Sequence, residues 1–162
     1  MALPRELALD DGQIEEMLSQ DWNCRIATID AQGRINLTPM WFGWADGKIF
    51  ITGRGQKVVN LRRNPTCTVL VDRNEKFPEL QAIMMQGTAR ILETAEEEAA
   101  EPGLAKARAQ MGAKYNGGHG KPAVENPPPN QATAGGKNRR WIVFEPDNSV
   151  TWDNFKLDRI GK

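Results

Sequence analysis

A basic segment at residues 53–65, GRGQKVVNLRRNP, has the residue types that are needed to bind an anion. Gly53 and Gly55 precede the expected start of a helix, and glycine lets the backbone approach a ligand closely. The free N–H groups and the positive dipole end of a helix N-terminus favour an anion. Lys57 falls in the first turn, and Asn60 follows one turn later on the same face. This spacing predicts a site for a single phosphate, with a solvent-exposed basic helix as the alternative.

The overall charge argues against a nucleic-acid partner. The chain has 162 residues with 21 basic and 21 acidic side chains, so its formal net charge is zero. A dedicated binder of duplex DNA usually carries a clear basic excess. Arg62 and Arg63 fall at the far end of the expected helix, where cations complement the dipole. The same charge balance argues against a polybasic membrane anchor.

The cysteines and the N-terminal sequence indicate a cytoplasmic protein. Cys24 and Cys67 are the two cysteines, and both fall in apolar, strand-like runs, so we expect buried thiols in a reducing compartment. The N-terminus lacks the apolar segment of a secretory signal. No run of residues approaches the roughly 18 apolar residues of a membrane span. His119 has no other His or Cys near it, so we expect no metal site.

Aromatic residues crowd the segment at residues 37–44, LTPMWFGW. Pro39 has no backbone donor, so it should lie at a sheet edge or at a bulge. Trp41, Phe42 and Trp44 either pack in the core and an interface, or they border a flat aromatic ligand that lies along this strand. In the second interpretation, backbone groups near Thr38 bind the polar edge of the ring, and the helix that follows binds its phosphate.

The remaining elements are typical of a mainly β protein. Apolar alternation and turn residues predict strands at 24–30, 35–44, 48–53, 66–72, 79–93, 139–146 and 149–155. We expect the first three strands to form an antiparallel meander and the fifth to bend at Gly87. Helices are expected at 10–20, before Asn64, and at 94–115 with an interruption near residues 102–103.

One long segment and the strand count complete the predicted organisation. Residues 116–138 are rich in Gly, Pro and Asn, and we expect a mobile loop there. Six or seven antiparallel strands, with one short helix inserted and no βαβ alternation, favour a closed or split β-barrel. We therefore predict a single split β-barrel domain over residues 1–162.

Four segments resemble a known family. They are ATIDAQGRINLTPMW (27–41), QKVVNLRRNP (56–65), MMQGTARI (84–91) and SVTWDNFKL (149–157). Together they resemble the pyridoxamine 5'-phosphate oxidase-like split β-barrel flavoproteins, which bind FMN or a related cofactor. The likeness is greatest to the branch that contains reductases dependent on the deazaflavin coenzyme F420.

The resemblance implies a homodimer with cofactor sites at the subunit interface. It implies that the phosphate lies at Lys57 and that the ring system lies along the strand that contains Trp41. It also implies that Trp152 reaches the cofactor from the partner chain. The complete set of implied cofactor-binding residues is Thr38, Pro39, Met40, Trp41, Ile51, Thr52, Arg54, Gln56, Lys57, Asn60, Gln86 and Trp152.

The activity implied by the resemblance is hydride transfer between F420 and a small organic substrate. The C-terminal sequence WDNFKLDRIGK has no counterpart of the substrate-binding Arg and His of pyridoxamine 5'-phosphate oxidase itself, which argues against pyridoxal phosphate synthesis. Two alternatives stay open, namely an FMN-dependent oxidase or reductase and a non-catalytic carrier of flavin or haem. No side chain is an evident acid or base.

Overall fold

The computed structural model describes residues 5–116 and 139–159. Most of the predicted loop at 116–138, and His119 within it, therefore lie outside the described residues. The strands are β1 (Cys24–Ile29), β2 (Ile35–Met40), β3 (Phe42–Ala45), β4 (Lys48–Gly53), β5 (Thr66–Arg73), β6 (Gln81–Leu92) and β7 (Arg140–Asp153). The helices are α1 (Asp11–Gln20), α2 (Gln56–Arg63), α3 (Ala95–Ala100) and α4 (Leu104–Asn116), with short 3-10 turns η1 (Arg5–Leu7), η2 (Phe77–Glu79) and η3 (Asn154–Arg159).

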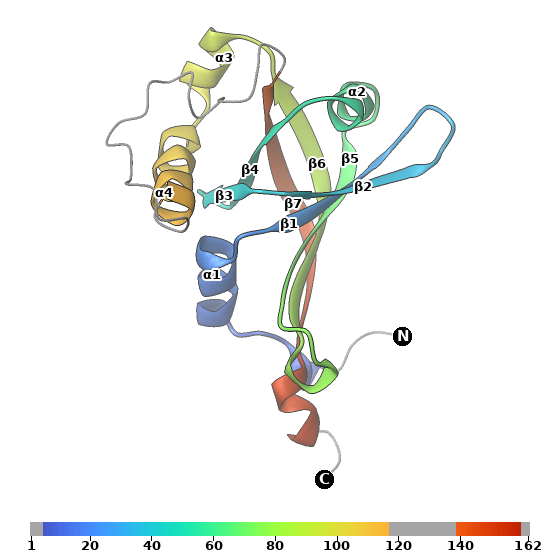
Figure 1. Ribbon diagram of the computed structural model, residues 1–162, viewed down its shortest axis with the longest axis vertical. Helices are drawn as coiled ribbons and strands as arrows, with labels where there is room; N and C mark the ends of the chain where they lie inside the picture. The colour runs from blue at the N-terminus through green and yellow to red at the C-terminus, as the bar shows by residue number, and fades with distance from the viewer. Residues whose placement is uncertain (1–4, 117–138, 160–162) are drawn as a thin grey trace.

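The seven strands form one antiparallel sheet in the order β2-β1-β5-β6-β7-β4-β3, which curls into a half-barrel (Figure 1). This confirms the mainly β, split-barrel prediction. The expected three-strand meander forms only in part: its two antiparallel hairpins, β1–β2 and β3–β4, are present, but β2 and β3 lie at opposite edges of the sheet. The run at 35–44 is two strands joined through Trp41. Pro39 lies in an edge strand, as predicted from its missing backbone donor.

The C-terminal part of the sheet also differs from the prediction. Most of the segments 139–146 and 149–155 belongs to a single long strand, β7, which pairs with β6 from Trp141 to Asp153 except at the bulge, while residues 154–155 begin η3. A register shift between Gln86 and Gly87 interrupts this pairing and confirms the predicted irregularity at Gly87. A Cβ atom at Gly87 would lie 2.1 Å from the Glu145 carbonyl oxygen, so only glycine fits here. The polar residues 147–148 look like a turn in sequence, but in the structure only Asp147 lacks a partner on β6, as the extra residue of a bulge.

The helices begin where their capping residues predict. Asp10 caps α1 and forms a reciprocal capping box with Gln13. Gly55 precedes α2 with a φ of 74°, in the left-handed region that favours glycine. The predicted interruption near residues 102–103 separates α3 from α4. No described helix is both long and apolar enough to cross a membrane.

Two apolar clusters form the core. The larger one fills the barrel and includes Phe42, Ile51, Val69, Ile142 and Phe144. The smaller one packs α4 against the sheet through Trp141, Phe50, Val143, Leu104 and Ala107. Both cysteines are buried, as predicted, and burial raises the pKa of Cys24 and of Cys67 to about 12.

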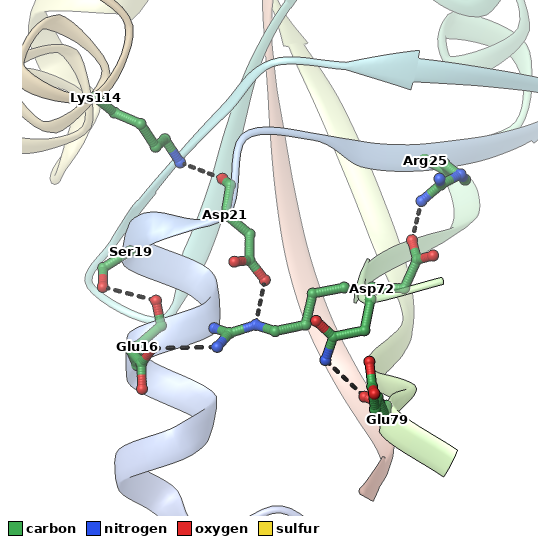
Figure 2. A network of polar contacts seen from close by, with 9 residues as sticks. Glu16, Ser19, Asp21, Arg25, Asp72, Glu79 and Lys114 are labelled. Carbon is green, nitrogen blue, oxygen red and sulfur yellow. Dashed lines mark hydrogen bonds and ion pairs between the residues drawn. The ribbon is translucent and has the colours of Figure 1, made fainter. Parts of the chain in front are cut away.

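A polar network fastens the end of α1 to the barrel (Figure 2). Arg73 on β5 contacts the carboxylates of Glu16 and Asp21, each at 3.1 Å. Lys114 on α4 donates to the backbone oxygen of Asp21 at 3.0 Å. Burial raises the pKa of Asp21, because the two hydrogen-bonding cations offset only part of its desolvation. The network therefore joins α1, β5 and α4 around the loop between α1 and β1.

Candidate functional site

The end of β4 and the start of α2 place Lys57 as the sequence predicts. Gly53 ends the strand, and a Cβ atom there would lie 2.8 Å from Ile142 Cδ1 and 3.3 Å from Lys57 Cδ. The absence of that atom lets the lysine stem lie against the strand. Lys57 Nζ donates to the Arg54 carbonyl oxygen at 3.3 Å, so its ammonium stays at the N-terminal end of the helix.

Arg139 joins this site from the start of β7, and sequence reasoning missed it. Its Nη1 donates to Thr52 Oγ1 at 3.4 Å. Its buried Nε has no hydrogen-bond partner among the described residues. Only the sheet topology indicates its position, because β4 pairs with β7 so that Gly53 lies opposite Arg140. This register brings the residue before β7 alongside the turn between β4 and α2.

Three cations therefore converge at one end of β4. Burial lowers the pKa of the Lys57 ammonium, and the positive charges of Arg139 and Arg54 lower it further. Among the described residues, no carboxylate forms an ion pair with Lys57 or Arg139. We call Arg54, Lys57 and Arg139 the cation cluster. A group of mutually repelling charges beside a helix N-terminus is suited to bind an anion.

The other two basic residues of the segment have structural roles. Arg62 makes a bidentate contact to Glu93, with distances of 2.6 and 2.8 Å. Arg63 Nη2 donates to the Ile29 carbonyl oxygen at 2.6 Å. Hydrogen bonding to Glu93 raises the pKa of Arg62. These contacts turn the two side chains toward the sheet. The start of the basic segment therefore contributes to the cation cluster, whereas its end is held by contacts within the protein.

The structure separates the two amides that were predicted at the phosphate. Gln56 is exposed at the first position of α2, whereas Asn60 is fully buried. Asn60 Nδ2 donates to Thr28 Oγ1 at 3.0 Å, and its Oδ1 accepts from Gln56 Nε2 at 2.8 Å. Asn60 therefore orients Gln56 and fixes the helix to β1, and it does not itself face the cation cluster.

The strand predicted to hold the ring presents one unusual group. Thr38 lies opposite the core residue Ile26, and its buried hydroxyl has no hydrogen-bond partner among the described residues. Pro39 is exposed and Met40 is half-buried. Ile51 on β4, which the resemblance also implies at the ring, is fully buried in the core. Its side chain is therefore not brought to the site.

Trp41 stands at the junction of β2 and β3 and is supported by other aromatic rings. Its indole stacks on the Tyr115 ring at a centroid distance of 4.3 Å and an interplanar angle of 5°. Trp22 meets both rings edge-on. The Tyr115 hydroxyl donates to backbone oxygens and accepts from the Phe42 N–H at 2.9 Å. Trp41 nevertheless remains 46% exposed, so it forms a rigid, accessible aromatic wall.

Gln86 and Trp152 lie far from the cation cluster of their own chain. Gln86 is exposed and accepts a hydrogen bond from Asn148 at 3.1 Å. Trp152 pairs with Ala82, at the other end of β7 from Arg140. Twelve residues of strand span roughly 40 Å along the chain. Trp152 therefore does not belong to the cation cluster of the same protomer.

The chain is similar to several solved structures of low sequence identity. A conserved hypothetical protein from Mycobacterium tuberculosis is 22% identical, with a TM-score of 0.76 over 98% of this chain and 93% of that one. A haem storage protein from Vibrio cholerae is 16% identical, with a TM-score of 0.64 over 88% and 93%. An F420 reductase is 20% identical, with a TM-score of 0.58 over 84% and 94%. At these identities the likeness establishes the shared fold.

Sequence comparison identifies the family. No curated protein matches the chain. The family model described as pyridoxamine 5'-phosphate oxidase matches residues 11–153, which contain every strand of the sheet and the helix that carries Lys57. The chain belongs to the pyridoxamine 5'-phosphate oxidase family.

Proposed function

We propose that the protein is an oxidoreductase that transfers a hydride between the deazaflavin coenzyme F420 and a small organic substrate. The observation that carries the proposal is the cation cluster, which brings three positive charges to the start of α2. Phe42, the residue after Trp41, pairs with Ile51 on the strand that leads to this cluster. The family membership and the fold it shares with an F420 reductase support a cofactor of the flavin type.

The cation cluster fits the phosphate of such a cofactor. Lys57 and Arg139 would bind the phosphate oxygens, and the free N–H groups at the start of α2 would add further donors. Binding would give the buried Arg139 Nε a partner. The negative charge of the phosphate would also offset the burial and the repulsion from Arg139 and Arg54, which together lower the pKa of Lys57. A bound phosphate would thus supply the hydrogen-bond acceptor and the negative charge that the cation cluster lacks in the free protein.

The strand junction fits the ring system. The buried Thr38 hydroxyl has no hydrogen-bond partner among the described residues, and the polar edge of a flavin-like ring would supply several donors and acceptors. Trp41 would wall one side of the ring region and keep water from it. When bound, the deazaflavin supplies the hydride, and the chain contributes its position and the exclusion of solvent.

The number of cations favours F420 over FMN. Lys57 and Arg139 would suffice to bind one phosphate, so FMN would need no contact to Arg54. F420 continues beyond its phosphate into a tail with carboxylates, and Arg54 is exposed at the outer side of the cluster. We therefore assign Lys57 and Arg139 to the phosphate and Arg54 to the acidic tail.

A homodimer is part of the proposal. On the edge strand β2, Ile35 is 74% exposed and Leu37 is 60% exposed. Apolar side chains this exposed on a sheet edge invite pairing with another surface. The distance of Trp152 from the cation cluster along β7 agrees with a role at the cofactor of a second protomer. A symmetric dimer would let each chain complete the site of the other.

Titration of the purified protein with F420 and with FMN, followed by fluorescence, tests the cofactor assignment. We expect tighter binding of F420, and we expect Arg54→Ala to weaken F420 more than FMN. Addition of an electron acceptor to the reduced complex then tests for turnover. Tighter binding of FMN would transfer the assignment to an FMN-dependent enzyme. Cofactor binding without turnover, over a panel of acceptors, would favour a carrier.

A further inference from the structure

A cavity away from the cation cluster has a volume of about 230 Å³. It lies where α1 and β3 meet the inner face of the long strand pair β6–β7. Ile14 and Leu18 from α1, Trp44 from β3, and Ile83 and Met85 from β6 form its walls. We call it the seam cavity. Its walls are apolar, and its opening is bordered by residues of β7.

The walls of the seam cavity are held in place. The Trp44 indole N–H donates to Glu15 Oε2 at 3.0 Å, and its backbone N–H donates to Gln110 Oε1 at 2.6 Å. Trp44 is therefore fixed from α1 on one side and from α4 on the other. Ile83 and Met85 belong to the barrel core and are 1% and 2% exposed. The cavity is preformed, and it would not need to be opened by a ligand.

The bulge in the sheet forms the polar border. Gln86 pairs with Asn148 and Gly87 pairs with Pro146, so Asp147 has no partner on β6. This extra residue and Ser149 border the cavity. The close approach of Gly87 to the Glu145 carbonyl keeps the bulge from relaxing. Bulges often re-aim side chains next to ligand sites.

The seam cavity is distinct from the cation cluster of its own chain. Trp44 lies opposite Ile49, whereas the cation cluster lies at Gly53, four residues further along β4. Four residues of strand correspond to roughly 13 Å. The described lining of the cavity contains no basic side chain. The Ser149 and Thr151 hydroxyls are hydrogen-bond donors, but no cation of the described lining balances the charge of an anion.

We propose that the seam cavity binds a small, uncharged aromatic molecule that carries one hydrogen-bond donor. Its apolar walls favour an uncharged ring. The Asp147 carboxylate and the Ser149 hydroxyl at the border accept a hydrogen bond from a hydroxyl or N–H group. The same carboxylate repels an anion of equal size. The proposal rests on this cavity alone and does not depend on the nature of the cofactor.

Methyl NMR with indole as the probe tests the proposal. Indole has one N–H donor and no charge, and indole-3-carboxylate is the matched anion. We expect saturable shifts of the Met85 and Ile83 methyl signals with indole and little change at Ile142, which lies elsewhere in the core. We expect indole-3-carboxylate to bind at least tenfold more weakly. The absence of saturable shifts, or equal binding of the two probes, would overturn the proposal.

A substitution at the border of the seam cavity gives a second test. Ser149→Trp places a large ring at the opening and, because Ser149 is exposed, leaves the core intact. We expect at least a tenfold loss of indole affinity. Thr88→Trp, at another exposed position of the same strand pair, is the control and should bind as the native protein does. Retained indole binding in Ser149→Trp contradicts the proposal. If that variant did not fold, the comparison of the two probes would still decide.

Discussion

The Asn60 side-chain amide donates a hydrogen bond to Thr28 Oγ1 at 3.0 Å and so joins α2 to β1. Both residues are fully buried. Since the Asn60 oxygen also accepts from Gln56, one side chain fixes the helix to the sheet and orients a residue at the start of the helix. The position of the proposed phosphate site thus depends on a polar contact beneath it.

Asn60→Ala should lower the free energy of unfolding by about 1–3 kcal/mol, because it leaves the buried Thr28 hydroxyl without its partner. Urea denaturation measures the change. Val59→Ala, at an exposed position of the same helix that makes no such contact, is the control, and it should cost no more than about 0.5 kcal/mol. Equal effects of the two substitutions would show that the buried contact has no special weight.

Arg139→Ala and Lys57→Ala should each weaken cofactor binding about tenfold to a hundredfold, since a charge-assisted contact to phosphate is worth roughly 1.5–3 kcal/mol. Neither substitution should lower the melting temperature of the free protein, because each removes one of three repelling charges. Fluorescence titration and thermal unfolding check both statements. Arg62→Ala removes a charge from the same helix, where Glu93 holds it, and should change affinity less than about twofold. An equal loss in all three variants would indicate a diffuse charge effect.

Lys114 should make the stability of the protein depend on pH in the alkaline range. Burial lowers its pKa to about 8 from an ordinary value of 10.5, and the nearby Cys24 and Asp21 offset only part of this. Below pH 8 the ammonium is charged in both states, and its burial destabilises the fold. Between pH 8 and 10.5 the unfolded chain binds the proton and the folded chain does not, so stability rises with pH.

The comparison with Lys114→Met isolates this effect. Relative to the variant, the native protein should gain stability as the pH rises from 8 to about 10. Denaturation at several pH values measures the difference. Other groups that titrate in this range are common to both proteins and cancel. A difference that does not vary with pH would mean that Lys114 keeps an ordinary pKa.

Leu37→Arg should convert the proposed dimer into a monomer. The side chain is 60% exposed on the edge strand β2, so the change leaves the core intact while it places a charge in the proposed interface. Light scattering should report twice the chain mass of 18.1 kDa for the native protein and the single chain mass for the variant. Val59→Arg, at an exposed position of α2, is the control. A native protein of single chain mass would contradict the dimer.

Local patterns in the sequence were sufficient for most elements but not for their arrangement. The cap at Asp10, the glycines before α2 and the irregularity at Gly87 depend on neighbouring residues, and the structure confirms them. The positions of β2 and β3 at opposite edges depend on how far the sheet curls. The curl is a property of the whole sheet, so the pattern of residues within one strand and its turn does not predict it.

The same distinction applies to the site. Lys57 could be predicted because the glycines and the helix start lie beside it in the chain. Arg139 could not, since only the pairing of β4 with β7 brings it there. Asn60 was predicted at the phosphate from its spacing to Lys57, but three residues of helix turn a side chain by about 60°. That rotation places the amide next to the buried Leu61.

The junction at Trp41 fixes the number of residues that the chain can have between β2 and β3. One residue links the two edge strands of the barrel. The hairpin turns near Gly33 and Gly47 face open space, so extra residues there would add only a slowly growing entropy of loop closure. An extra residue at Trp41 would instead slide β2 or β3 by one position and exchange its inward and outward faces. Insertions and deletions should therefore be tolerated at the turns and rejected at the junction, whatever residue they contain.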